Sequence, residues 1–208
     1  MESFTALTAI AAPLLRPNID TDQIIPTRFL ARLSESGVGE GLFAEWRTRA
    51  DGTPDPEFPL HKAPWDQARI IVAGANFGCG SSREAAARAL RERGIRAVIA
   101  ESFGDIFFNN CFRNGVLPVR LPGAVVQDLG DALLHRAPAA LELEVDLARE
   151  TVSDPARGLA WAFVTPPRLR RMLLQGLDEI GSTLCEAPAI DAFRRSDRAR
   201  RPWAYLDL

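Results

Sequence analysis

The chain has 208 residues, of which 25 are basic and 27 acidic, so its net charge of −2 provides no field that would attract a nucleic acid. No apolar run approaches the roughly 20 residues that cross a bilayer, and no secretory signal pattern is present, so we expect no membrane association. Three separated cysteines, Cys79, Cys111 and Cys185, without a C-x-x-C pair fit a reducing cytoplasm and argue against a metal site built by this chain alone.

A strand is predicted over 8–15, followed by a polar loop over 16–22 that contains Asp20 and Asp22. A calcium loop starting at Asp20 would need glycine at its sixth position and glutamate at its twelfth, and the chain has neither there, so calcium is excluded. Two interpretations remain. The carboxylates bond nearby amides and shape a turn, or they lie in an extended segment and face one cleft together.

The next part of the chain has no firm periodicity. A short helix is expected near 29–33, and glycines, prolines and acidic residues then recur over 34–65, which predicts a long loop. Loops of this length are uncommon in compact domains unless they serve function or an interface.

From residue 68 onward the expected elements alternate regularly. They are strand 69–73, helix 82–93, strand 97–100, helix 103–112, strand 116–120 and helix 125–134. Such alternation indicates an α/β fold with a largely parallel sheet. Strict alternation over 141–147 and a strand over 161–165 predict an antiparallel addition, and a helix over 167–175 closes the fold. We expect one domain over 1–193 and a solvated, arginine-rich tail over 194–208.

The most informative segment is NFGCGSSRE at 76–84, which follows an apolar strand and opens an alanine-rich helical pattern. Glycines let the backbone approach a ligand closely, and the first amides of a helix have no partner within it, so this turn suits an anion. Arg83 adds a planar fork for a carboxylate or phosphate. A second interpretation is a capping box, because Ser81 and Glu84 have its spacing.

Other chemistries fit this turn less well. A phosphate loop needs a lysine after Gly80, and a dinucleotide-binding loop needs a third glycine where Arg83 stands. Cys79 as a nucleophile would need a base, and the two histidines, His61 and His135, lie outside the strand-end loops.

A third group of polar residues lies in the helix expected over 103–112. The serine near its start and the Asn-Gly pair at its end are explained by capping, and its phenylalanines by packing. Asn109 and Asn110 are poor helix formers, so a contact role for them is an alternative to a structural one.

Taken in order, the segments 18–26, 76–84, 102–118 and 176–181 make the chain similar to the small subunits of 3-isopropylmalate dehydratase, in the aconitase superfamily. The resemblance implies a swivelling β/β/α domain like the C-terminal domain of aconitase, with a partly parallel central sheet. It also implies a heterodimer or higher assembly with a large subunit that carries a [4Fe-4S] cluster. The implied reaction interconverts 2-isopropylmalate and 3-isopropylmalate through 2-isopropylmaleate, in leucine biosynthesis.

The same resemblance implies a task for each residue of the turn. Ser81 would be the base, acting as an alkoxide on a proton alpha to a carboxylate, while the cluster iron is the acid for the leaving hydroxyl. Ser82 and Arg83 would bind a substrate carboxylate. Asp20 and Asp22 would line the cleft and orient their partners.

Two departures from the family pattern bear on the substrate. The family continues after the Arg-Glu pair with His-Ala-Pro-Trp, where this chain has Ala-Ala-Ala-Arg at 85–88. The lysine common after Phe-Leu is Ala31, so Arg28 and Arg32 are candidate substrate-binding cations, together with Asn109 as a polar contact. An apolar pocket over 29–41 would accept an isopropyl group. Alternatives are a small subunit for another branched malate, such as citramalate or dimethylmalate, and a non-catalytic paralogue that binds the large subunit.

Overall fold

The computed structural model describes residues 1–32, 37–80, 83–135 and 142–205, which are built around a seven-stranded sheet in the order β4-β3-β2-β1-β5-β6-β7. Strand β1 (Ala6–Leu14) is central and pairs in parallel with β2 (Ile70–Ala73). Outward from β2 follow the parallel strands β3 (Ala97–Ala100) and β4 (Leu117–Arg120). The expected α/β class with a partly parallel sheet is confirmed.

The other side of β1 carries the antiparallel part of the sheet. It consists of β5 (Glu142–Asp146), β6 (Thr151–Asp154) and β7 (Leu159–Ala162). The antiparallel addition is therefore confirmed, but the strand predicted over 161–165 is wrong in its bounds, and β6 was not predicted. Three of the four residues of β6 are polar, so no apolar pattern marks it.

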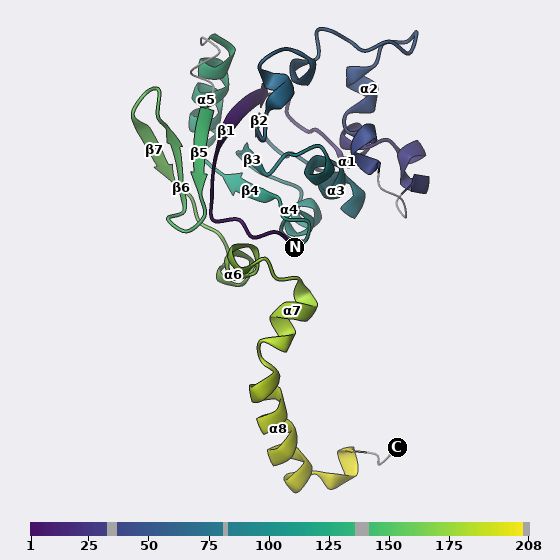
Figure 1. Ribbon diagram of the computed structural model, residues 1–208, viewed down its shortest axis with the longest axis vertical. Helices are drawn as coiled ribbons and strands as arrows, with labels where there is room; N and C mark the ends of the chain where they lie inside the picture. The colour runs from purple at the N-terminus through teal and green to yellow at the C-terminus, as the bar shows by residue number, and fades with distance from the viewer. Residues whose placement is uncertain (33–36, 81–82, 136–141, 206–208) are drawn as a thin grey trace.

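The parallel strands are buried between layers of helix. Every residue of β2 and β3 is buried, which is why both form unbroken apolar runs. Helices α3 (Glu84–Glu92) and α4 (Asp105–Arg113) cover one face, and α5 (Gly123–His135) returns over the other face against β1, β2 and β3 (Figure 1). The buried side of α3 consists of alanines and Leu90, which allows close packing.

The segment predicted as a long loop over 34–65 contains short helices in its described part. The helix η1 (Thr27–Arg32) matches the one expected near 29–33. It is followed by η2 (Val38–Gly41), α2 (Ala44–Arg47), η3 (Pro59–His61) and η4 (Trp65–Gln67). Apolar side chains at irregular spacing, Val38, Phe43 and Phe58 among them, are buried in the core. Because that spacing has no helical or strand period, periodicity did not reveal a packed segment.

In the described residues, four helical segments follow β7. Helix α6 (Pro167–Gln175) matches the prediction, and α7 (Glu179–Leu184), α8 (Ala187–Arg200) and η6 (Pro202–Ala204) extend away from the sheet as an arm (Figure 1). The arm exposes the large apolar side chains Ile180, Leu184, Phe193 and Trp203. The boundary expected between 193 and 194 falls inside α8, and the division into domain and tail stays a prediction. Within the described ranges, no helix has the length and apolarity to cross a membrane.

Candidate active site

Three loops meet at the carboxyl ends of the parallel strands, after β1, β2 and β3. Backbone bonds continue the sheet through them. The Gly78 N–H donates to the Ile19 carbonyl at 2.7 Å, and the Phe77 N–H donates to the Ser102 carbonyl at 3.0 Å. Ligand sites in α/β proteins form at this edge of the sheet. The loop with the two aspartates and the glycine turn are thereby brought together, as the site prediction requires.

Two asparagines fasten these loops to one another. Asn18 and Asn76 adopt left-handed backbone conformations, with φ of 56° and 59°, which asparagine tolerates better than most residues. Nδ2 of Asn76 donates to Oδ1 of Asn18 at 2.8 Å, and the Asn76 N–H donates to Oγ of Ser102 at 2.9 Å. Neither asparagine was assigned a role of its own from the sequence. The pattern that could have indicated a role is an asparagine shortly after each of the strands β1 and β2, because asparagine is common in turns.

Two glycines of the turn are needed for different reasons. Gly78 has a φ of +71°, and a Cβ there would overlap the Phe107 ring of α4. Gly80 has a φ of +87° but faces open space, with Cβ of Asp20 the nearest atom at 3.5 Å. Packing and conformation both require glycine at position 78, whereas conformation alone requires it at position 80.

We expect Gly78→Ala to lower the free energy of unfolding by about 3 kcal/mol or more, because the overlap with Phe107 and the left-handed strain must both be absorbed. Gly80→Ala is the matched control and should cost about 1–2 kcal/mol, from strain alone. Urea unfolding of the isolated subunit, followed by circular dichroism, measures both values. Equal losses would show that Phe107 does not restrict the turn.

Helix α3 begins at Glu84, with Arg83 in the N-cap position and no capping bond from its side chain. A capping box on Ser81 would place Glu84 at the third helical position, so that interpretation is wrong. Ser81 and Ser82 lie outside the described residues, and their roles remain predictions. They directly precede a helix start whose first amides Arg83 does not cap.

Arg83 is anchored to the loop that follows β1. Its Nη1 forms an ion pair with the Asp22 carboxylate and donates to Oγ1 of Thr27 at 3.0 Å, while the Thr27 hydroxyl donates to Asp22 Oδ1 at 3.1 Å. The Arg83 side chain is 20% exposed. Between described residues, its hydrogen bonds all use Nη1, which leaves the Nε–Nη2 edge for a second carboxylate. Thr27 was not predicted, since one threonine before a short helix has no distinctive pattern.

Asp20 and Asp22 have different roles in the structure. Asp20 is the N-cap of α1 (Thr21–Ile24), where its Oδ1 accepts from the Gln23 N–H at 2.7 Å and Gln23 Oε1 accepts from the Asp20 N–H at 3.0 Å. The extended segment with two parallel carboxylates is therefore wrong, because successive residues of a helix are rotated by about 100°. The turn-shaping interpretation holds for Asp20, while Asp22 pairs with Arg83.

The two other candidate cations lie on η1. Arg28 forms an ion pair with Glu45, and its guanidinium lies 5.1 Å from the centre of the Phe29 ring. The side chain of Arg32 is outside the described part of the structure. A substrate-binding role for either arginine stays a prediction, and for Arg28 it requires the pair with Glu45 to open.

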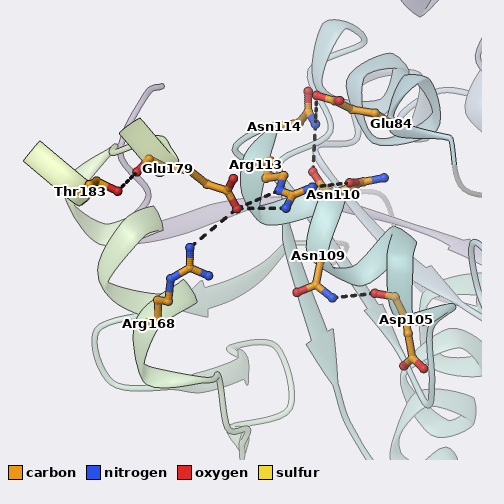
Figure 2. Close-up of polar contacts among 9 residues, drawn as sticks. All are labelled: Glu84, Asp105, Asn109, Asn110, Arg113, Asn114, Arg168, Glu179 and Thr183. Carbon is orange, nitrogen blue, oxygen red and sulfur yellow. Dashed lines mark hydrogen bonds and ion pairs between the residues drawn. The ribbon is translucent and has the colours of Figure 1, made fainter. Parts of the chain in front are cut away.

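The asparagines of α4 bond mainly within their own helix. Asn109 is exposed, and its Nδ2 donates to the Asp105 carbonyl at 2.9 Å (Figure 2). Asn110 is buried, and its Oδ1 accepts from Nη1 of Arg113 at 3.5 Å. A substrate contact by Asn109 remains a prediction, with an exposed side chain in its favour.

The end of α4 connects the glycine turn with the C-terminal arm (Figure 2). Nδ2 of Asn114 donates to Oε1 of Glu84, the first residue of α3, at 3.4 Å. Arg113 donates from Nη2 to Oε1 of Glu179 on α7 at 3.0 Å. The sequence suggested only a capping role for Asn114, so this link between helices was missed.

A hollow of about 230 Å³ opens between the glycine turn and the start of α4. Its lining residues are Gly78, Gly80, Gly104, Asp105, Ile106 and Phe107. With three glycines at its wall, a ligand in this hollow would meet the backbone directly.

The cysteines of this chain do not assemble into a site. Cys79 is partly exposed in the turn, Cys185 is exposed on the arm, and Cys111 is buried in α4, where burial raises the pKa of its thiol well above the usual value. The rings of His61 and His135 each bond a carbonyl of their own segment. Across the described ranges, no three His, Cys, Asp or Glu side chains are grouped to hold a metal ion, so they do not fit an iron-sulfur cluster.

Comparisons with known proteins agree at the levels of domain, sequence and structure. Residues 1–124 match the family model of the aconitase C-terminal domain. The chain is 53% identical to a protein named 3-isopropylmalate dehydratase small subunit from Cupriavidus necator, with 100% of both chains covered. It is 51% identical to the protein of the same name from Gluconacetobacter diazotrophicus, over 98% of this chain and 97% of that one.

A solved structure is similar over most of its length as well. The crystal structure titled 3-isopropylmalate dehydratase from Methanocaldococcus jannaschii covers 91% of this chain and 99% of its own, with a TM-score of 0.61 and 27% identity.

Proposed function

Because the chain belongs to the family of 3-isopropylmalate dehydratase small subunits, in the aconitase superfamily, we propose that it forms one side of the active site of the hydro-lyase that interconverts 2-isopropylmalate and 3-isopropylmalate in leucine biosynthesis. The observation that carries this proposal is the position of Arg83. It stands at the end of the glycine turn, is anchored through Nη1, and has a second edge for a substrate carboxylate.

Ser81 is the proposed base. It removes the proton alpha to a carboxylate, the C–H electrons form the double bond of 2-isopropylmaleate, and the hydroxyl leaves the adjacent carbon. Water then adds back with the opposite placement of hydrogen and hydroxyl. Since Arg83 occupies the N-cap without capping the first amides of α3, those amides can stabilise a serine alkoxide just before the helix.

Arg83 is the proposed carboxylate clamp, with the Ser82 hydroxyl as a second donor. A guanidinium binds a carboxylate best through two parallel N–H bonds, and the Nε–Nη2 edge offers them. Asp22 and Thr27 hold the opposite corner of the guanidinium and so orient it. In this proposal Asp22 is a positioning residue, and Asp20 keeps the loop after β1 in the shape that Asp22 needs.

The other side of the active site is proposed to belong to a separate large subunit in a heterodimer or higher assembly. Departure of a hydroxyl needs a Lewis acid, and we assign it to a [4Fe-4S] cluster held by the large subunit, since the described side chains of this chain do not fit one. A cytoplasmic location completes the proposal, because an exposed thiol such as Cys185 persists in a reducing compartment.

The departure from the family pattern just after Glu84 does not remove the proposed clamp. The alanines at 85–87, which replace His-Ala-Pro of the family pattern, are buried in the interior. That departure therefore changes the packing beneath the site and leaves Arg83 in place above it.

A substrate panel tests the proposal. With a cluster-loaded large subunit, we expect kcat/KM for 2-isopropylmalate to exceed that for citramalate by about 10-fold or more, the discrimination available from added methyl groups in an apolar pocket. Absorbance of the unsaturated intermediate measures both rates. Turnover of citramalate or dimethylmalate without turnover of isopropylmalate would assign the chain to a different hydro-lyase, and no turnover of any would indicate a non-catalytic paralogue.

A further inference from the structure

The short helix η2 is held on α3 by one carboxylate. Oε2 of Glu92 accepts the Gly39 N–H at 2.8 Å and the Gly37 N–H at 3.3 Å. The contact is close, because a Cβ built on Gly39 would lie 2.9 Å from Cβ of Glu92. Val38, between the two glycines, is fully buried. Glu92 therefore satisfies backbone donors of a segment more than 50 residues earlier in the chain.

The second oxygen of the same carboxylate is held from its own helix. Nε of Arg88 donates to Glu92 Oε1 at 2.8 Å, one turn earlier on α3. Burial alone would raise the pKa of Glu92, but the Gly39 amide, Arg88 and the Gly37 amide together outweigh it and lower that pKa. Glu92 is thus ionised at neutral pH. Arg88 stands where the family pattern has tryptophan, and in this chain it holds the Glu92 carboxylate in place.

Helix η2 also packs against η1, which is hydrogen-bonded to Arg83, the proposed carboxylate clamp. A Cβ built on Gly41 would lie 2.6 Å from the Phe29 ring, so the end of η2 rests directly on η1. Helix η1 begins at Thr27, which is hydrogen-bonded to Arg83. A substrate carboxylate on Arg83 would therefore lie beside η1, and the half-buried Phe29 and Leu30 are the apolar side chains that follow.

We infer that Glu92 is a positioning residue that sets which alkyl group the enzyme accepts. Glu92 holds η2 on α3, the helix that follows the proposed base, and η2 in turn packs against η1. The apolar side chains of η1, Phe29 and Leu30, are thereby held at a set distance from Arg83. The inference rests on the proposed function, because the alkyl group in question is that of the malate held by Arg83. Without Glu92, Phe29 and Leu30 are free to shift. The kcat/KM for a malate with a large alkyl group then falls relative to that for a malate with a small one.

The test compares Glu92→Ala and Glu92→Gln with Glu57→Gln, which removes a surface carboxylate paired with Lys62. We expect Glu92→Ala to reduce the ratio of kcat/KM for 2-isopropylmalate to that for citramalate about 10-fold, with kcat for citramalate within about twofold of wild type. Glu92→Gln should recover part of the ratio, since its amide oxygen still accepts a bond. Glu57→Gln should leave the ratio unchanged. A general loss of folding would lower both rates equally, whereas an unchanged ratio in a Glu92→Ala variant whose kcat for citramalate stays near wild type overturns the inference.

Hydrogen exchange in the isolated subunit keeps this test separate from the proposed function. Amides in 37–41 should exchange about 10-fold faster in Glu92→Ala than in wild type, and at the wild-type rate in Glu57→Gln. If no isopropylmalate is turned over by wild type, the proposed function fails while the exchange data still judge the role of Glu92. Unchanged exchange in Glu92→Ala shows that Glu92 does not position η2, whatever the substrate.

Discussion

Replacing Ser81 by alanine is expected to lower kcat for 2-isopropylmalate by about 10³-fold or more, with the two subunits still associated. A positioned base contributes roughly 10²–10⁴-fold to a proton transfer, and a serine alkoxide before a helix start that Arg83 does not cap has no substitute nearby in the proposal. Stopped-flow absorbance of 2-isopropylmaleate measures the loss, and size-exclusion chromatography with the large subunit measures association.

A matched control separates the base from a general effect of losing a hydroxyl. Ser153 lies on β6, in the antiparallel part of the sheet, and Ser153→Ala should keep wild-type activity. If Ser81→Ala retains more than about a tenth of the wild-type kcat, the base is another group, and the assignment of Ser81 is wrong.

Arg83→Lys is expected to reduce kcat/KM by about 10²-fold, although the positive charge remains. Lysine cannot offer two parallel N–H bonds to one carboxylate, and it cannot hold Asp22 and substrate at the same time. Because the clamp acts on bound substrate and on the transition state, KM should rise and kcat should fall together. Steady-state kinetics of the reconstituted enzyme separate the two parameters.

Two further variants show whether geometry or charge matters at this position. Asp22→Asn keeps Arg83 but weakens its anchor, so it should raise KM about 10-fold with a smaller change in kcat. Arg113→Lys makes the same exchange at an exposed ion pair with Glu179 and should leave both parameters near wild type. A wild-type KM in Arg83→Lys would mean that Arg83 does not contact the substrate.

The sheet was predictable for a physical reason. Strands β2 and β3 are buried on both faces, so each residue had to be apolar, and β5 alternates because one of its faces is wetter. Strand β6 was not predicted because it is short and polar and has no apolar pattern. It is held in the sheet by backbone hydrogen bonds to β5 and β7. The segment after η1 escaped because Val38, Phe43 and Phe58 are buried without any repeating interval.

The candidate site was predictable in its parts and less so in their arrangement. Glycine spacing correctly placed Gly78 and Gly80 in a turn, and the structure shows that both have a positive φ. Spacing left open whether the two carboxylates shaped a turn or faced one cleft together, and in the structure Asp20 caps α1 while Asp22 pairs with Arg83. A single sequence contains no signal that distinguishes these outcomes, since the capping partner, Gln23, is an ordinary polar residue in a loop.

The contacts that connect the site to the rest of the fold are long-range and were therefore missed. Thr27 meets Arg83, Asn114 meets Glu84, and Glu92 meets Gly39, each across at least 30 residues. No local pattern predicts such pairs. They become visible only when the sheet places loops and helix ends beside one another, and the first two hold Arg83 and Glu84 at the start of α3.

In the proposed enzyme, this chain supplies the base and the clamp, while a large subunit supplies the Lewis acid. The most direct measurement follows 2-isopropylmalate by nuclear magnetic resonance with this chain alone, with the cluster-loaded large subunit alone, and with both. Both 2-isopropylmaleate and 3-isopropylmalate should form only when the two subunits are present together, and Ser81→Ala should abolish their formation. Formation of either product by the large subunit alone, or at an undiminished rate with Ser81→Ala, would contradict this assignment.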